Sequence, residues 1–425
     1  MDSIPGKYKN FVNALLEKDQ RQRACPGAQR PAAWDGRYPG GIIAPMKSAP
    51  SLPPPVWIAD PQGLADLAQR LLAEPVVAVD TESNSLHAFQ EQVCLIQFST
   101  PEVDYLVDPL AVPDLTPLEP VFAAPQVEKV FHGADYDVLT LRRDFGFTFV
   151  NLFDTMLAAR ILGYPRVGLG ALLEAFFGVR LDKRFQRADW GQRPLPQALL
   201  DYARLDTHYL IPLRHRLRAE LEQTGRWPLA AEDFARLAVL KPRARPRAAW
   251  EIKGAQLLTP QQRAVLAELV AYRDQIARRR NRPRFKVLSN KVLLAIAQAL
   301  PRHLEALRRL PGMSPGLVRR HGRALLQAVE RGLKAPPRPV TQGPRPNEAY
   351  LARLEALRRW RQAKGRAMGV PSDVVLPREV LEDLAAHDPR DPQALAEVMA
   401  TTPWRRAQFG AEILEILAQV RQATR

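Results

Sequence analysis

Short apolar runs alternate with stretches of helical periodicity between residues 56 and 240. Four runs rich in β-branched or aromatic residues predict strands, at Val76 to Asp80, Val93 to Ser99, Tyr105 to Asp108 and Val127 to His132. Apolar residues three or four positions apart predict helices at Gly63 to Ala73, Asp135 to Phe145, Thr155 to Leu162, Leu169 to Phe177 and Pro196 to Leu221. Short connections join the first three strands, which favours hairpin pairing. The pattern therefore predicts an α/β domain with a mixed sheet.

Beyond about residue 255 the strand pattern stops, and a helical pattern repeats itself after 88 residues without a gap. The matched positions are mainly apolar residues or prolines at helical spacing, including Pro283 with Pro371, Val287 with Val375, Leu293 with Leu381 and Leu307 with Leu395. A duplicated all-α unit would keep such a pattern. We therefore expect two small helical domains after the α/β domain.

Proline-rich and arginine-rich stretches mark the expected domain boundaries. Residues 1–55 are rich in Pro, Gly and Arg and are predicted to be a disordered tail. The α/β domain is expected at 56–240, a basic linker at 241–254, the first helical module at 255–334, a Pro-rich linker at 335–346 and the second helical module at 347–425.

The overall composition excludes several classes of protein. No apolar run of about 18 uncharged residues is present, so no membrane-spanning helix and no membrane partner are expected. The two cysteines, Cys25 and Cys94, are too few for a disulfide framework or a zinc site. A protein of the reducing cytoplasm is expected, and since no protein partner can be inferred we take it to be a monomer.

The net charge of +16 is divided very unevenly along the chain. Residues 56–240 hold 17 Lys and Arg against 25 Asp and Glu, whereas residues 263–334 hold 17 against 4 and residues 347–425 hold 12 against 11. The middle module is therefore a candidate for binding a polyanion. The alternative is an ordinary solvated surface in an arginine-rich protein, although such a bias would not spare the first and last domains.

Candidate chemistry begins with two carboxylates on one strand and two polar residues on one helix. Asp80 and Glu82 are two apart at the end of an expected strand, which places them on the same side. Tyr202 and Asp206 are four apart in an expected helix, which places both over the same turn.

A further carboxylate is expected from the stretch between His132 and Leu139, where a strand runs through a small-residue turn into a helix. Such turns commonly carry the sites of α/β domains. Asp135 and Asp137 both lie there, and the spacing alone does not choose between them. Four carboxylates would repel one another unless divalent cations neutralised them, and oxygen ligands favour hard ions such as Mg²⁺.

These motifs resemble those of the DEDD exonucleases, and within them ribonuclease D, over about residues 56–420. Asp80-Thr81-Glu82 resembles the first motif, His132 to Asp137 the second and Tyr202 to Asp206 the third, while the helical repeats resemble paired HRDC domains. Position 201 is Asp instead of the His of the other subclass, which favours the tyrosine subclass. The resemblance implies an RNase H-like fold, two Mg²⁺ or Mn²⁺ ions on Asp80, Glu82, Asp137 and Asp206, and Tyr202 as the residue that positions the attacking water.

The activity that the resemblance implies is 3′→5′ exonuclease cleavage of RNA, releasing nucleoside 5′-monophosphates. Precursors of transfer RNA and other stable RNAs are the expected substrates. Two alternatives stay open, a DNA exonuclease of repair and a catalytically idle nucleic-acid-binding protein. Matched RNA and DNA digestions, with and without magnesium, would separate all three.

Several residues around these motifs receive auxiliary roles. Asp135 is expected to cap the helix after the second motif, and Asp154 to cap the helix that begins at Thr155. The cluster around Phe185 and Trp190 combines cations with aromatic residues, which suits a single nucleic-acid strand, although an ordinary surface loop fits equally. The candidate nucleic-acid contacts are Ser83, Leu86, His132, Arg187, Arg243, Arg245, Arg279, Arg280, Arg284 and Lys286.

Overall fold

The structure, a computed structural model, describes residues 52–241, 252–338 and 347–423. The predicted disorder of the N-terminal tail concerns residues that lie almost entirely outside these ranges. Arg243 and Arg245 of the basic linker also lie outside the described residues.

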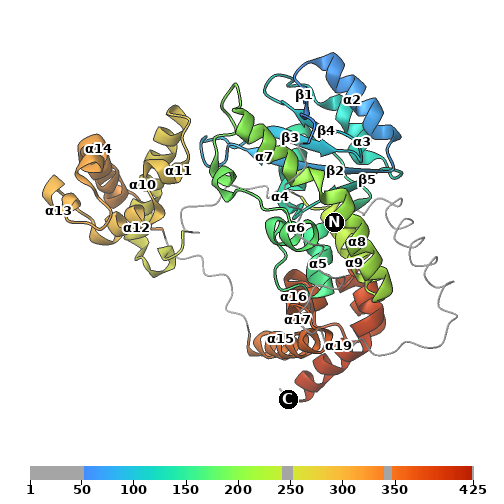
Figure 1. Ribbon diagram of the computed structural model, residues 1–425. Coiled ribbons are helices and arrows are strands. Elements are labelled where there is room, and N and C mark those ends of the chain that lie inside the picture. Colours follow the sequence, from blue (N-terminus) through green and yellow to red (C-terminus); the bar gives the residue numbers. More distant parts are fainter. Residues whose placement is uncertain (1–51, 242–251, 339–346, 424–425) are drawn as a thin grey trace.

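A six-stranded mixed sheet forms the centre of the first domain (Figure 1). Its strands are β1 (Val56–Ile58), β2 (Val76–Ser83), β3 (Val93–Ser99), β4 (Asp104–Val107), β5 (Glu128–Phe131) and β6 (Leu152–Asp154). The strand order is β1-β4-β3-β2-β5-β6. Strands β2, β3 and β4 pair antiparallel as consecutive hairpins, and the remaining neighbours pair parallel. The expected mixed α/β sheet is confirmed.

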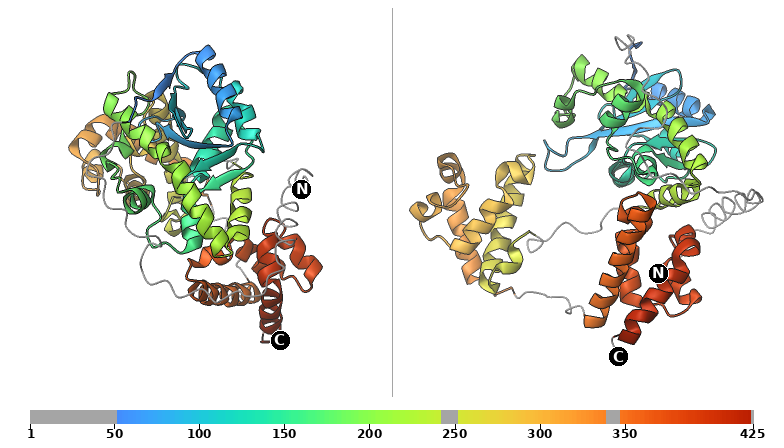
Figure 2. Two further views of the ribbon diagram at one scale, coloured as in Figure 1. Left: turned by 45° about the vertical axis from the view of Figure 1, so that its right-hand side comes forward. Right: turned by 60° about the horizontal axis from the view of Figure 1, so that its bottom comes forward.

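Helices cover both faces of this sheet (Figure 2). The helical elements of the first domain are α2 (Pro61–Ala73), η1 (Thr116–Leu118), α3 (Glu119–Ala123), α4 (Asp135–Phe145), α5 (Thr155–Leu162), α6 (Leu169–Phe177), η2 (Lys183–Arg187), α7 (Gln197–His208), α8 (Leu210–Gln223) and α9 (Trp227–Leu237). Apolar residues of α2, α3 and α4 fill the core on one face. Those of α5 to α9 pack on the other.

One predicted helix is wrong in its length. The stretch from Pro196 to Leu221 forms two helices, α7 and α8, with the break at Tyr209. Pro212 explains the break, because it has no N–H to donate to a preceding turn and is tolerated only in the first turn of a new helix. The strand β1 and the helix α9 were not predicted. Strand β1 is only three residues long, whereas α9 does carry apolar residues at helical spacing, at Ala230, Phe234 and Leu237.

Two all-α modules follow, as the repeat predicts. The first consists of η4 (Ala255–Leu257), α10 (Pro260–Arg279), α11 (Arg284–Val287), α12 (Asn290–Ala299), α13 (Leu304–Arg308) and α14 (Pro315–Lys334). The second consists of α15 (Glu348–Met368), α16 (Ser372–Val375), α17 (Arg378–His387), α18 (Pro392–Val398) and α19 (Pro403–Ala423). The repeat extends to the backbone, since Leu300 and Asp388, 88 residues apart, both adopt a left-handed conformation with φ of 49° and 47°.

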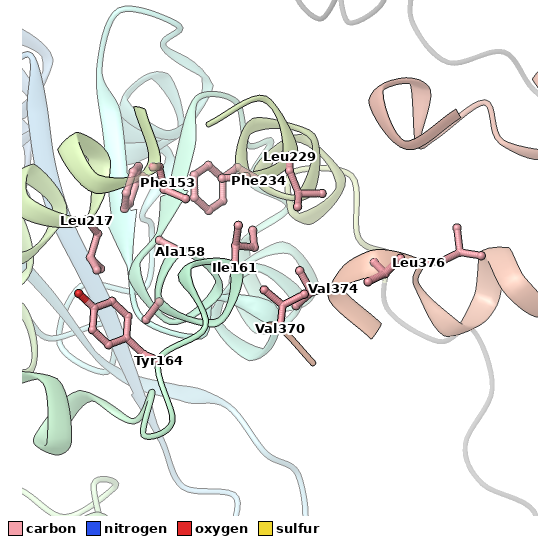
Figure 3. Packing of buried hydrophobic residues seen from close by; sticks show 14 of the residues in the cluster. Phe153, Ala158, Ile161, Tyr164, Leu217, Leu229, Phe234, Val370, Val374 and Leu376 are labelled. Atoms are coloured by element: carbon pink, nitrogen blue, oxygen red, sulfur yellow. The ribbon is translucent and has the colours of Figure 1, made fainter. Parts of the chain in front are cut away.

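The second module is packed tightly against the first domain (Figure 3). Val370 and Val374 lie in the same buried cluster as Phe153, Ile161 and Leu229. The first domain and the second module therefore share one hydrophobic core.

A buried ion-pair network reinforces this shared core. The Arg405 side chain is fully buried and contacts Glu232 at 2.5 Å and Asp233 at 2.8 Å. Arg405 also donates to the carbonyl oxygen of Val374 within its own module. Removing the Arg405 guanidinium from water costs free energy. Its ion pairs with the first domain offset that cost only while the second module stays docked.

The first module, yellow to orange in Figure 1, lies to the left of the first domain in that view. It meets the first domain at the loop between β2 and β3, where the backbone N–H of Phe89 donates to Asn281 Oδ1 at 3.1 Å. The guanidinium groups of Arg284 and Arg278 lie 4.5 and 5.5 Å from the centre of the Phe89 ring. Phe89 also packs against the apolar core of this module.

Candidate active site

Strand β2 places the two carboxylates of the first motif on the face of the sheet that α7 covers. Asp80 pairs with Gln97 of β3, and Glu82 pairs with Leu95. The pairing register shifts directly after Glu82, which ends the regular ladder beside the site. Residues paired across antiparallel strands point to the same face, so Gln97 shares the face of Asp80.

Helix α7 supplies the third motif. Tyr202 and Asp206 lie one turn apart and are both buried, with 7% and 6% of their surface exposed. A hydrogen bond of 2.7 Å from Ser99 Oγ to Thr207 Oγ1 ties this helix to β3. The helix therefore lies across the strands that carry Asp80, and the predicted first and third motifs are brought together.

The second motif delivers Asp137 from the first turn of α4. Its side chain is buried, and Oδ1 accepts a 2.5 Å hydrogen bond from Thr81 Oγ1, the residue between Asp80 and Glu82. This bond links the second motif directly to the first. Asp135 is exposed on the same helix, and no hydrogen bond ties it to the other motifs.

The expected cap by Asp135 is wrong, whereas the expected cap by Asp154 is confirmed. Residue Ala134 occupies the N-cap of α4, and its side chain offers no acceptor. Asp154 accepts from the amides of Met156 and Leu157 of α5, and also from those of Gly133 and Ala134. The Asp154 carboxylate thus caps α5 and also binds the turn that precedes α4. Asp135 therefore has no capping role.

The site carboxylates are electrostatically coupled. Burial, followed by repulsion from Asp137, Asp206 and Glu82, raises the pKa of Asp80 well above its usual range. Burial and the charges of Asp206 and Asp137 do the same to the pKa of Glu82. Burial raises the pKa of Asp137 to about 6 and that of Asp206 to about 7. Such mutual effects require the four groups to share one low-dielectric site.

A cluster of this kind fits hard divalent cations. Its donors are all carboxylate oxygens, and burial followed by mutual repulsion raises the pKa values of Asp80 and Glu82, a cost that positive ions would relieve. Within the described residues, no three acidic, histidine or cysteine side chains are close enough as they stand to form a metal-binding group. One oxygen of Asp137 is instead directed toward Thr81.

Aromatic neighbours fix the ring of Tyr202. The rings of Phe185 and Trp190 lie 5.7 and 6.3 Å from it, centre to centre. Burial and the charges of Asp206, Glu82 and Asp80 raise the pKa of the Tyr202 phenol. Tyr202 therefore stays protonated at neutral pH and can act as a hydrogen-bond donor on the side of the carboxylates.

Gln97 is a residue that the sequence analysis missed. Its side chain is completely buried, and neither its amide nitrogen nor its amide oxygen has a hydrogen-bond partner in the described part of the chain. A buried unpaired amide costs roughly 1–3 kcal/mol, so its place opposite Asp80 calls for a role. A polar residue between Ile96 and Phe98 in an apolar strand is the signal that could have revealed it.

The candidate nucleic-acid contacts of the first domain surround the ends of these motifs. Ser83 is hydrogen-bonded to the Tyr136 hydroxyl at 2.8 Å, and Leu86 is 38% exposed on the loop after β2. His132 is hydrogen-bonded to Thr155, and burial lowers its pKa to about 4, so the ring is neutral. Arg187 presents an exposed side chain.

The loop after β2 is also braced by the cluster around Phe185. The backbone oxygen of Arg187 lies 3.1 Å from the His87 ring nitrogen Nε2. The candidate contacts of the first module, Arg279, Arg280, Arg284 and Lys286, are exposed at the end of α10 and on α11, next to Phe89 of this loop. The structure thus brings the first module beside the loop that carries Leu86.

In the described ranges, no helix is both long and apolar enough to cross a membrane.

Comparison with known proteins assigns the family. Residues 55–222 match the 3′-5′ exonuclease family, and residues 262–329 and 350–417 each match the HRDC domain. The chain is 32% identical over 378 residues to ribonuclease D of Acidiphilium cryptum (strain JF-5), covering 87% of this chain and 95% of the relative.

Solved structures agree with the sequence matches. The crystal structure of Escherichia coli RNase D, an exoribonuclease involved in structured RNA processing, superposes with a TM-score of 0.65 and 28% identity, covering 86% of this chain and 98% of that chain. The catalytic core of RRP6 from Trypanosoma brucei superposes with a TM-score of 0.59 and 31% identity, covering 68% of this chain and 82% of that chain. The protein therefore belongs to the ribonuclease D family and is a 3′→5′ exoribonuclease.

Proposed function

We propose that the protein trims the 3′ ends of transfer-RNA precursors and other stable RNAs in the cytoplasm, acting as a monomer and releasing nucleoside 5′-monophosphates. The observation that carries the proposal is the joining of the three motifs, with Asp137 bonded to Thr81 between Asp80 and Glu82 and with α7 laid across β3. Because one chain supplies every site residue, no second subunit is needed for the chemistry.

Asp80, Glu82, Asp137 and Asp206 would hold two divalent cations, Mg²⁺ or Mn²⁺. When bound, such ions activate a water molecule and stabilise the charge that develops on the phosphate and on the departing 3′ oxygen. The protein's own contribution is to keep four carboxylates together in a buried place, at the cost reflected in their raised pKa values.

Tyr202 would position the attacking water through its hydroxyl. Its packing against Phe185 and Trp190 fixes the ring, and its raised pKa keeps the hydroxyl protonated, so it donates and does not act as a base. Gln97 would be free to orient Asp80, because its amide lies on the same face and has no hydrogen-bond partner in the described part of the chain. Leu86 and Ser83 would border the terminal nucleotide.

Substrate capture would depend on the basic residues of the linker and the first module. The acidic first domain repels RNA at long range, whereas the first module attracts it. The four candidate cations of this module, together with Arg243 and Arg245 of the linker, would contact phosphates.

The test is digestion of a 5′-labelled transfer-RNA precursor with an extended 3′ end, beside a DNA of the same sequence, with Mg²⁺ and with a chelator. We expect a 3′→5′ ladder on the RNA, 5′-monophosphate products and no cleavage with chelator. Preferential digestion of the DNA would overturn the choice of substrate.

Matched variants test the site. Asp137→Asn should abolish cleavage with folding intact, whereas Asp135→Asn, on the same helix but exposed, should remain active. The opposite result would overturn the assignment of the second motif. Tyr202→Phe keeps the ring and removes only the hydroxyl, so turnover should fall by roughly 10² or more while metal affinity, measured by calorimetry, is retained.

A further inference from the structure

The second helical module contains a cavity between its two long helices. Helices α15 and α19 lie side by side (Figure 1), and a cavity of about 490 Å³ opens between the first part of α15, the end of α19 and the turn that follows α17. Its charged lining residues are Arg353 on α15, Asp388 and Arg390 in the turn, and Arg421 on α19. Pockets of roughly 300–1,000 Å³ bind small molecules, so this cavity has room for one.

Asp388 holds two of these arginines in place. Its Oδ1 atom accepts a 2.6 Å hydrogen bond from Arg421 Nη1, and its Oδ2 atom lies 3.5 Å from Arg353 Nη1. The Nε group of Arg353 also donates to the carbonyl oxygen of Ala385 at 2.8 Å. Only 12% of the Arg353 side chain and 24% of the Arg421 side chain are exposed. Because both guanidinium groups are already fixed, a ligand would bind them with a smaller loss of conformational entropy.

The lining carries more positive charge than Asp388 can neutralise. Three arginines and one aspartate give the lining a net charge of +2. Arg390 is exposed and forms no hydrogen bond or ion pair with another residue of the described ranges. The start of α15 and the end of α19 contribute opposite helix-dipole charges of about half a unit each, which largely cancel. The arginines therefore determine the sign of the site, and it favours an anion.

In the first module the equivalent helices touch at this place. Gly332 of α14 is 88 residues before Val420, and a Cβ on Gly332 would lie 2.4 Å from the Cα of Val265 in α10. Val265 is in turn the equivalent of Arg353. The side chain of Val420 does not permit the same close approach of the two backbones. Valine in place of glycine therefore leaves space between α15 and α19.

The surfaces that face each other have also changed from apolar to charged. Val265 is buried in the apolar core of the first module, and Leu300 and Leu333 pack against this core. Their equivalents 88 residues later are Arg353, Asp388 and Arg421. An ion-pair cluster in place of packed apolar residues is often neutral or unfavourable for stability. Stability alone therefore does not explain the three charges, and ligand binding is the role that the cavity permits.

The arrangement of the arginines favours a phosphate group over a carboxylate. Guanidinium groups bind both anions through paired hydrogen bonds. A carboxylate offers only two oxygens, whereas a phosphate monoester has three terminal oxygens for the three arginines, and its charge of about −1.5 to −2 at neutral pH matches the surplus of the lining. No aromatic residue is among the described residues that line the cavity, so none of them would stack on a nucleic-acid base.

We propose that this cavity binds the phosphate group of a small organic phosphate through Arg353, Arg390 and Arg421. Asp388 keeps two of the guanidinium groups oriented, and Arg390 supplies the third from the rim. The site shares no residue with the carboxylates of the active site. The inference therefore goes beyond the proposed function and does not depend on it.

Isothermal titration calorimetry of the full-length protein tests this site. The probes are inorganic phosphate, adenosine 5′-monophosphate and adenosine, and a chelator is present so that the acidic active site holds no cations and repels phosphate. Phosphate and the monophosphate should bind, and adenosine should not. Two short RNAs, with and without a 5′-terminal phosphate, are compared with the monophosphate. Tighter binding of the phosphorylated RNA than of the other RNA and of the monophosphate would overturn the choice of a small compound.

Matched variants decide whether the cavity is the place of binding. Arg390→Gln should weaken phosphate binding by roughly tenfold, the scale of one lost charge-assisted hydrogen bond, whereas Arg358→Gln, at an exposed arginine of α15 outside the lining, should not. Ala418→Glu adds a negative charge to the lining and should abolish binding. Helix α19 should tolerate this change, because the equivalent residue of the first module is Glu330. Absence of binding to the unaltered protein, or equal affinities for Arg390→Gln and Arg358→Gln, would overturn the proposal.

Discussion

The first and second helical modules share one fold and differ in what their surfaces contact. The second is nearly neutral and is fixed to the first domain through a common core and the buried Arg405. The first is strongly basic and touches the first domain through Phe89. The position of Arg405 is occupied in the first module by Leu317. The two copies of one fold thus differ in role because their side chains differ. One copy supports the first domain, and the other exposes a cationic surface.

The largest effect is expected from Arg405→Ala. It leaves Glu232 buried without its cationic partner and leaves Asp233 with Arg236 alone, which should cost about 3–5 kcal/mol in free energy of unfolding. Chemical denaturation measures this loss. The control is Leu317→Ala at the equivalent place of the first module, where the side chain is partly exposed and a smaller loss is expected. Equal losses would show that the two modules are attached alike.

A smaller loss of stability is expected from Gly163→Ala. This substitution tests the close contact between the first domain and the second module. Gly163 has φ of 88°, and a Cβ there would lie 2.4 Å from the carbonyl oxygen of Gly369 in the second module. Gly146→Ala is the control, because it has φ of 77° and nothing within 4 Å. The control should lose about 1 kcal/mol from the backbone alone, and Gly163→Ala clearly more. Thermal unfolding that is identical for both would contradict the close contact.

The stability of the metal-free protein should depend on pH through the carboxylates of the site. Burial raises the folded-state pKa of Asp137 to about 6 and of Asp206 to about 7. Between an unfolded pKa near 4 and these values the folded state binds more protons, so stability falls as the pH rises from about 5 to about 7.

Thermal unfolding at pH 5 and pH 8, with a chelator, checks this direction. A loss on the order of 4 kcal/mol is expected for the metal-free protein, and Mg²⁺ should remove most of it by stabilising the charged carboxylates. Greater stability at pH 8 than at pH 5 without metal would be the contrary result.

The smallest effect concerns the charges of the two modules. Replacing Arg279 and Arg280 by Ala should flatten the log–log salt slope of RNA binding by about 1.4, since each phosphate contact on a single strand contributes about 0.7. Replacing Arg358 and Arg366, two exposed arginines of the second module, should leave the slope unchanged. Equal slopes for both pairs would mean that neither module is preferred by RNA.

Local periodicity was sufficient to predict the mixed sheet, the helical repeat and the face shared by Asp80 and Glu82. The choice of Asp137 over Asp135 depended on a family resemblance, and the structure adds the bond to Thr81 and the exposure of Asp135. The sheet, the repeat and the shared face follow from spacings that the sequence carries directly, whereas the choice of Asp137 does not.

Features that depend on tertiary packing were not predictable in the same way. Asp154 was expected to cap one helix, but its reach to the amides of Gly133 and Ala134 requires β5 and β6 to be neighbours. Arg405 is one of many arginines, and nothing in its local sequence indicates burial against a different domain. Gln97 gains its meaning only from its cross-strand position opposite Asp80.

Helix α5 joins two places that are otherwise discussed separately. Its eight residues span about 12 Å. At one end Asp154 holds the turn that presents Asp137, and at the other Gly163 lies under the backbone of Gly369. Helix α5 therefore connects the active site to the docked second module and sets the distance between them. The alignment of the second motif thus depends partly on a module that supplies none of the site residues, so a poor fit there would appear as an error of catalytic geometry.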